Sequence, residues 1–308
     1  MYDTPLEAMD NMIYNAPDAI MRMTVMGGQA RVIMCRTTRM TQQAQDTHLA
    51  SDAAAAAFGR ILPATAMLST DLKQENSSVT VTFNGSGPAG KIVCVGHGST
   101  LKITAQYPQA EVPPLENGAQ DVPKYIGSEG NLTVIKDLGA GEPYVGVSRL
   151  KSGGVGEDFA LYYTVSEQVP SIIALGCLNA SRKVLSSGGI LVQALPNADE
   201  KTLKMLEDRI PFYSNISREI YDMSMQVLAE SWFKNMDLKI LSYEELHFAC
   251  DCSREKMKNA LRAAGKDELE DMVLNNKDIE MTCWFCRKTH KFSVDEIKDI
   301  LREAGDKA

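Results

Sequence analysis

Four of the seven cysteines lie near the end of the chain in two close pairs. Cys250 and Cys252 form one pair, Cys283 and Cys286 form the other, and residues 253–282 lie between the pairs. If folding brings the pairs together, they supply the four tetrahedral sulfur ligands that zinc prefers at a structural site. Four protein ligands leave no position for a catalytic water. The spacing therefore predicts one structural zinc ion per chain.

The same spacing allows redox chemistry. Within each pair the sulfurs are close enough that, without the metal, oxidation needs only a local rearrangement. Five basic residues lie nearby, and they either favour the thiolate forms or are solvated surface cations; these are Arg254, Lys256, Lys258, Arg287 and Lys288. A segment of about sixty residues is small for an independent core, so metal binding is expected to contribute much of its folding free energy. Losing the metal should unfold it and expose apolar surface.

The remaining cysteines and the histidines add no further site. Cys35, Cys94 and Cys177 are scattered through apolar or mixed sequence and are predicted to be core thiols. An odd number of cysteines does not indicate a disulfide framework. His247 and His290 flank the cysteine pairs and are predicted to be bystanders, with substitute or outer-sphere ligation as the alternative.

Composition limits the classes of function. The 308 residues suggest about two domains, and 32 Lys and Arg against 40 Asp and Glu give a net charge of −8. This acidic balance argues against a nucleic-acid partner. No apolar run reaches the length of a membrane helix, and Met1–Glu7 lack the features of a signal peptide, so a cytoplasmic location is expected.

Periodicity predicts a mixed first domain. An alanine-rich helix is expected over residues 46–68. Alternating apolar residues then predict the strands of an antiparallel sheet, including a hairpin closed by Gly139–Glu142; their ranges are 79–83, 91–95, 101–105, 131–136 and 144–147. A helix over 157–169 and strands over 172–175 and 190–195 complete this region, which is expected to end at Pro196.

Helical patterns follow Pro196. Ile216, Ile220, Met223 and Val227 form an apolar stripe with helical spacing. Capping boxes at residues 242–245 and 293–296 predict two further helix starts. The predicted fold class is α+β, with an antiparallel sheet and packed helices in the first domain; the regions are an N-terminal mixed domain (1–196), a helical linker (197–247) and a small α-rich zinc-binding domain (248–308).

Two motifs suggest other chemistry. Gly85–Gly90 matches a dinucleotide-binding glycine pattern, but a strand follows where a phosphate-binding helix would be needed, so a plain turn is predicted. Cys283 and Cys286 with the two residues between them could form the redox pair of a thiol–disulfide oxidoreductase, which would require a βαβ context. Two alternatives to a redox-regulated binding protein are therefore this enzyme and a zinc-stabilised interaction module that does not respond to oxidants. No other catalytic motif is present, and a protein without enzyme activity is predicted.

The cysteine spacing and three short motifs resemble the 33-kilodalton heat-shock protein family of redox-regulated holdase chaperones. The motifs are Gly85–Pro88, Cys252–Glu255 and Leu191–Pro196. The resemblance covers essentially the whole chain. It implies that the reduced protein holds zinc through all four cysteines and is inactive. It further implies that hypochlorite, or peroxide with heat, forms redox-active disulfides within each pair and releases zinc, after which the tail and the linker unfold.

The resemblance also implies partners and a role in the stress response. The activated protein, commonly a homodimer, would bind unfolding client proteins without ATP, protect against oxidative and heat stress, and pass its clients to ATP-dependent foldases. Neither nucleic acid nor membrane is an expected partner. The apolar stripe from Ile216 to Val227 is then a candidate for the part of the linker that changes its structure on activation.

Overall fold

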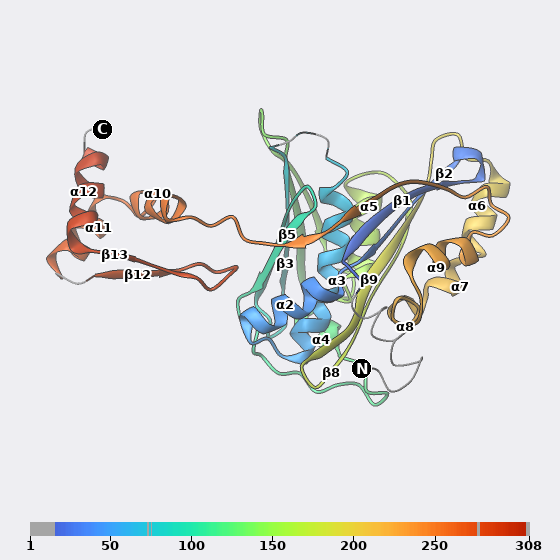
Figure 1. Cartoon of the computed structure of the whole chain (residues 1–308), viewed down its shortest axis with the longest axis horizontal. Coiled ribbons are helices and arrows are strands. Elements are labelled where there is room, and N and C mark those ends of the chain that lie inside the picture. Colours follow the sequence, from blue (N-terminus) through green and yellow to red (C-terminus); the bar gives the residue numbers. More distant parts are fainter. Residues whose placement is uncertain (1–15, 73, 75, 276–277, 306–308) are drawn as a thin grey trace, which may run out of the picture. The chain divides into compact units, whose positions relative to one another are not determined.

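The computed structural model describes residues 16–305 apart from 73, 75, 276 and 277 (Figure 1). The chain divides into two compact units, Met1–Phe248 and Ala249–Ala308. Residues 197–248 therefore group with the first unit by their contacts. The expectation about Met1–Glu7 concerns residues outside the described part. Within the described part, no helix has the length and apolar character needed to cross a membrane.

Two antiparallel sheets form the first unit. The five-stranded sheet has the order β10-β1-β2-β9-β8; its strands are β1 (Ala19–Val25), β2 (Ala30–Arg36), β8 (Ser171–Ala180), β9 (Lys183–Ala194) and β10 (Lys239–Glu245). The six-stranded sheet has the order β11-β5-β4-β3-β6-β7, with only β11 parallel to its neighbour; its strands are β3 (Ser78–Gly85), β4 (Lys91–His97), β5 (Thr100–Ala105), β6 (Gly130–Asp137), β7 (Tyr144–Arg149) and β11 (His247–Phe248). The predicted antiparallel sheet and hairpin are confirmed.

Helix α3 (Asp52–Ser69) packs against strands of both sheets and is buried along almost its whole length. The helix predicted over 46–68 is confirmed for residues 52–68, but its predicted start is wrong, because α2 (Thr38–His48) is followed by Leu49, which has a left-handed backbone with φ of 50°. Ser51 then starts α3 by accepting a hydrogen bond from the Ala54 amide. Two shorter helices, α4 (Val122–Ile126) and α5 (Gly156–Val165), also belong to this unit.

The five-stranded sheet is covered on both faces. Ile20 and Ile33 belong to the core that includes α3, whereas the adjacent Met21 and Met34 belong to a second core on the opposite face. Buried residues of four short helices complete this second core; the helices are α6 (Glu200–Glu207), α7 (Ile210–Tyr213), α8 (Ile216–Asp222) and α9 (Met225–Trp232). Strands buried on both faces show little alternation, which explains why the sequence did not reveal β1 and β2.

Two predictions for residues 197–247 need correction. The stripe is not on one helix, because Met223 is extended and Ser224 starts α9 by accepting a hydrogen bond from the Val227 amide. Ile216 and Ile220 are buried, but Val227 is 49% exposed. The expected helix start at 242–245 is wrong, because these residues form β10 and pair with the edge of β1. A tertiary partner has overridden the local capping pattern.

The second unit has a small core of its own. Its elements are α10 (Arg254–Ala264), α11 (Lys266–Leu274), β12 (Ile279–Thr282), β13 (Thr289–Phe292) and α12 (Val294–Gly305). The buried apolar cluster consists of Leu261, Leu269, Phe292, Ile297 and Ile300. The predicted capping box of the last helix is confirmed. The Glu296 amide donates to Ser293 Oγ at 3.3 Å, and the Ser293 amide donates to the Glu296 carboxylate at 2.8 Å.

Candidate metal centre

The four cysteines lie on two short segments of the second unit. Cys250 and Cys252 precede α10, whose N-terminus is capped by Ser253 through a hydrogen bond from the Lys256 amide. Cys283 and Cys286 lie in the turn between β12 and β13. The turn is closed by the Cys283 amide, which donates to the Lys288 carbonyl at 2.9 Å. Local backbone structure thus holds each pair in place.

The four sulfur atoms lie within 4.8 Å of one another. Cys250 Sγ is 3.7 Å from Cys283 Sγ, and Cys252 Sγ is 3.3 Å from Cys286 Sγ. A tetrahedral zinc ion with Zn–S bonds of about 2.3 Å would place its sulfur ligands about 3.8 Å apart. The number, type and spacing of these donor atoms therefore fit a closed four-thiolate metal site.

The surroundings shift the pKa values of the clustered thiols in different directions. Burial raises the pKa of Cys252 and Cys250, and neighbouring sulfurs add to the effect. Burial also raises the pKa of Cys283, but the backbone amides of Cys286 and Phe285, with neighbouring thiols, outweigh it and hold this pKa below its ordinary value. Four adjacent thiolates repel one another unless a cation compensates their charge. The cluster is therefore suited to a divalent metal.

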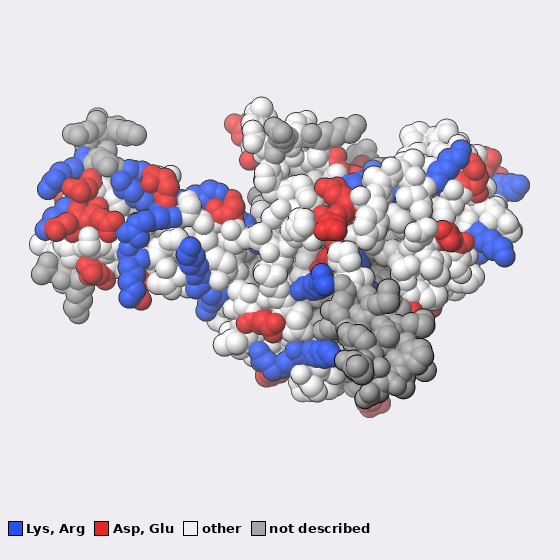
Figure 2. Space-filling view, in the orientation of Figure 1, with Lys and Arg blue, Asp and Glu red and all other residues white. Residues whose placement is uncertain are grey.

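Two of the five nearby basic residues form ion pairs with acidic side chains. Arg254 forms an ion pair with Glu296 at 2.6 Å, and Lys256 forms one with Asp251. Basic and acidic side chains are intermixed on the visible face of the second unit (Figure 2). These pairings favour the interpretation of Arg254 and Lys256 as surface ion pairs rather than as a positive field acting on the thiols.

The two flanking histidines occupy different places. His290 on β13 is buried, and its Nε2 lies 4.0 Å from Cys252 Sγ. His290 is thus close enough to act as an outer-sphere neighbour, a role that the sequence could not separate from that of a bystander. His247 belongs to β11 of the first unit, where it pairs with Thr100 of β5.

The other three cysteines lie in the first unit. Cys35 and Cys94 are fully buried, and Cys177 is partly buried. Burial raises the pKa of Cys94 and of Cys177 to about 12, and it raises the pKa of Cys35 as well. These side chains remain protonated near neutral pH and are poor nucleophiles. The prediction of core thiols is consistent with this placement.

The oxidoreductase alternative lacks its structural context. Cys283 and Cys286 lie in the turn of an antiparallel hairpin, not between a strand and a helix of a βαβ unit. In the glycine pattern Gly85–Gly90, Gly85 ends β3 and the remaining residues form a turn that leads to β4. Together, the fold and the cysteine cluster define a two-unit protein in which a small unit with a four-cysteine cluster suited to a metal follows a larger α+β unit.

Comparisons with known proteins agree with this description. The family model described as Hsp33 protein matches residues 18–293. A 33 kDa chaperonin of Clostridium botulinum is 37% identical over 287 residues, which cover 92% of this chain and 97% of that protein. A 33 kDa chaperonin of Clostridioides difficile is 36% identical over 290 residues, with 93% and 99% coverage. The crystal structure of the 33 kDa chaperonin from Thermotoga maritima has a TM-score of 0.85 at 30% identity and covers 94% of this chain and 100% of that one.

The chain belongs to the Hsp33 family. It is a redox-regulated chaperone with a four-cysteine cluster in its second unit, and it acts by binding rather than by catalysis. The predicted family, fold class and non-enzymatic function are confirmed.

Proposed function

We propose that Cys250, Cys252, Cys283 and Cys286 bind one zinc ion in the reduced protein and that this bound state is inactive. The observation that carries the proposal is the approach of all four sulfurs to within 4.8 Å. Zinc at this site would be structural, because four thiolates fill its tetrahedral shell. The proposed compartment is the reducing cytoplasm, where the thiolates stay available for the metal.

Oxidation is proposed to act within each pair, as the family resemblance implies. Cys250 would join Cys252, and Cys283 would join Cys286. With hypochlorite as the oxidant, two thiolates lose two electrons to form one disulfide, and hypochlorite takes up these electrons and two protons to give chloride and water. The same reaction at both pairs converts all four ligands into disulfide sulfurs, and the cysteines release the metal.

Unfolding of the second unit is proposed to follow. Its buried apolar cluster contains five of the residues that the structure describes, so metal binding supplies a large part of its stability. We propose that residues 1–196 remain folded and that the linker, residues 197–247, unfolds together with 248–308. Apolar surface on the five-stranded sheet, now covered by α6–α9, would become available to unfolding clients. The activated form would be a homodimer that hands its clients to ATP-dependent foldases.

Zinc content and holdase activity measured on one preparation test this proposal. Light scattering of a thermally unfolding client reports the activity before oxidation, after hypochlorite treatment and after reduction. Zinc release and suppression of aggregation should appear together and reverse together. A protein that keeps its zinc, or releases it without gaining activity, contradicts the switch. Peptide mapping of the oxidised protein identifies the disulfide partners.

A further inference from the structure

A groove follows the outer edge of β8. This strand is the last one of the five-stranded sheet, and within the described residues no backbone hydrogen bond reaches its outer edge. Two adjoining cavities of about 500 Å³ and 320 Å³ lie along it. The first is lined by Ile172–Leu175 and the second by Leu175–Asn179, so together they follow eight residues of the strand. The groove thus offers unpaired backbone groups over most of the length of β8.

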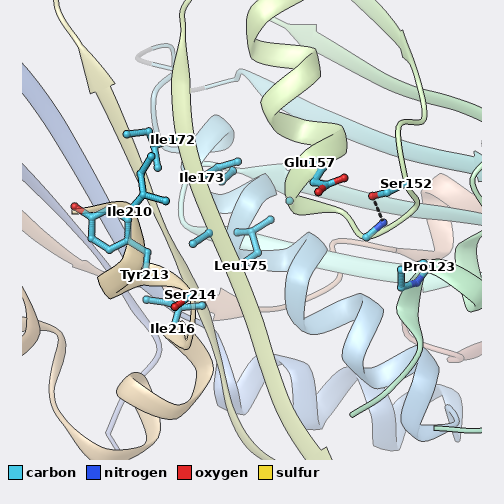
Figure 3. A pocket seen from close by; sticks show the side chains of 13 residues that line it. Pro123, Ser152, Glu157, Ile172, Ile173, Leu175, Ile210, Tyr213, Ser214 and Ile216 are labelled. Atoms are coloured by element: carbon cyan, nitrogen blue, oxygen red, sulfur yellow. Dashed lines mark hydrogen bonds between the residues drawn. The ribbon is translucent and has the colours of Figure 1, made fainter. Parts of the chain in front are cut away.

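The walls of the groove come from the layers on either side of the sheet. Ile210, Tyr213 and Ile216, from α7 and the start of α8, lie on one side of β8, and Glu157 and Pro123 lie on the other (Figure 3). The space between these walls lies beside the outer edge of β8, in the plane of the sheet. It is where a sixth strand would continue the hydrogen bonding, beside the apolar side chains of Ile172, Ile173 and Leu175 on β8 itself.

Arg60 gives the second cavity a positive charge, whereas Glu157 carries a negative charge in the first cavity. Arg60 is the only charged residue of α3 other than Asp52 at the helix start, and it lines the second cavity. One guanidinium nitrogen donates to the Gly154 carbonyl at 3.2 Å, while the buried Nε has no hydrogen-bond partner. No carboxylate forms an ion pair with Arg60 among the residues that the structure describes. A partly buried cation without a carboxylate partner favours an incoming carboxylate, which pairs with guanidinium in a planar, directional way.

We propose that this groove binds an extended polypeptide segment as a sixth strand and that an acidic side chain of the segment pairs with Arg60. The inference rests on the proposed function, because the occupant would be a segment of an unfolding client. Backbone pairing recognises an extended chain largely independently of its sequence, which suits a chaperone with many clients. Arg60 adds a preference for segments that carry a carboxylate beside apolar residues.

The groove is also placed to respond to the proposed switch. Ile210, Tyr213 and Ile216 belong to the proposed linker, whereas β8 and Arg60 belong to the region proposed to stay folded. Unfolding of the linker would remove one wall and leave the strand edge and the cation in position. Binding is therefore expected in the oxidised protein, and it should be weaker in the reduced protein.

The test uses a dye-labelled eight-residue peptide of alternating valine and threonine with one glutamate, and a matched peptide with glutamine in its place. Fluorescence anisotropy gives the Kd of each for the oxidised full-length chain. The wild type should bind the glutamate peptide about tenfold more tightly, as expected for a charge-assisted hydrogen bond. Arg60→Gln should remove this preference, and Arg60→Lys should keep part of it. Arg149→Gln, on the exposed edge strand β7 of the other sheet, is the matched control and should behave as the wild type.

Hydrogen exchange locates the bound peptide and separates the possible outcomes. Saturating peptide should slow amide exchange in Ser171–Ala180. Equal affinity for both peptides, or an unchanged preference in Arg60→Gln, would overturn the inference. Slow exchange that depends on protein concentration and needs no peptide would also overturn it, since a second copy would then occupy the edge. Suppression of client aggregation is measured on the same samples. If the wild type suppresses aggregation but shows no peptide preference, the groove inference fails while the chaperone function stands.

Discussion

The guanidinium group of Arg254 lies over the ring of Phe292, 4.5 Å from its centre. Arg254 follows Cys252 by two residues, and Phe292 ends the strand that follows Cys286. The same guanidinium also pairs with Glu296 on α12 at 2.6 Å. One side chain therefore ties the segment that carries the first cysteine pair to the two elements that follow the second pair.

Replacing Arg254 should loosen the metal centre. In Arg254→Ala the stacking on Phe292, worth about 1 kcal/mol at a partly exposed site, is lost together with the ion pair to Glu296. We expect zinc release at a fixed peroxide concentration to become a few times faster, as measured with a chromogenic chelator. Lys298→Ala removes a solvent-exposed ion pair to Asp295 in the same unit and serves as the control. Equal release rates for the two variants would contradict the role of Arg254.

Alkylation should separate the two groups of cysteines. Iodoacetamide reacts with thiolates, and burial raises the pKa values of Cys35, Cys94 and Cys177. At pH 8 a zinc chelator is expected to unfold the second unit and to end the burial that raises the pKa of Cys250 and Cys252, so all four clustered cysteines should be labelled within minutes. Cys35, Cys94 and Cys177 should be labelled only after denaturation. Mass spectrometry of the digested protein counts the labels, and early labelling of any of these three would show that the first unit opens locally.

Asp18 should make the first unit less stable as the pH rises. Its carboxylate accepts hydrogen bonds from the Arg39 and Met40 amides at the start of α2, yet burial outweighs these and the nearby arginine charges, and raises its pKa to about 6. Between pH 3.8 and 6 the native state therefore binds more protons than the unfolded state at this group. Its contribution to the free energy of unfolding should fall by about 3 kcal/mol across that window and stay constant above it.

The comparison with Asp18→Asn isolates this contribution from those of other carboxylates. Urea unfolding of both proteins is followed through Trp232, which is buried in the first unit, in a Trp284→Phe background. As the pH rises from 4 to 6.5, the wild type should lose stability relative to Asp18→Asn. Parallel stability curves over this range would show that the carboxyl group titrates normally in the folded protein.

The cap of the last helix should contribute to zinc retention. Ser293→Ala removes the side chain that accepts the Glu296 amide, a change that costs about 1 kcal/mol at a helix start. Because Ile297 and Ile300 on this helix are buried, we expect a lower melting temperature of the second unit and faster zinc release. Ser224→Ala removes the cap of α9 in the first unit and is the matched control. It should lower the stability reported by Trp232 and leave the melting temperature of the second unit unchanged.

Local patterns were sufficient to predict part of this structure. Strands β3–β7 alternate between buried and exposed residues and were recognised from that period. The spacing of the four cysteines predicted that they lie close together. This prediction needs only the ligand geometry of a metal ion and does not require the path of the chain between the two pairs to be known. The assignment of zinc itself remains a proposal.

Features that depend on distant partners could not be predicted. Residues 242–245 satisfy a helix-capping pattern, but the open edge of β1 pairs with them as a strand. The contact of Arg254 with Phe292 has no local signal. Arg60 does have one, since a single arginine within a long apolar helix is unusual. Its place in a groove becomes evident only when the topology puts β8 at the end of the sheet.

Strand β10 has a mechanical consequence for the way in which the first unit opens. Among the residues that the structure describes, β1 is its only neighbour in the sheet, and its last residue, Glu245, precedes Cys250 by five positions. A terminal strand pulled from one end peels away one residue pair at a time, whereas an interior strand must break its bonds to two neighbours together. Tension that arises after Phe248 would first break the two residue pairs of β11 with β5 and would then strip β10 progressively, from the pair Ala19–Glu245 toward Thr24–Lys239.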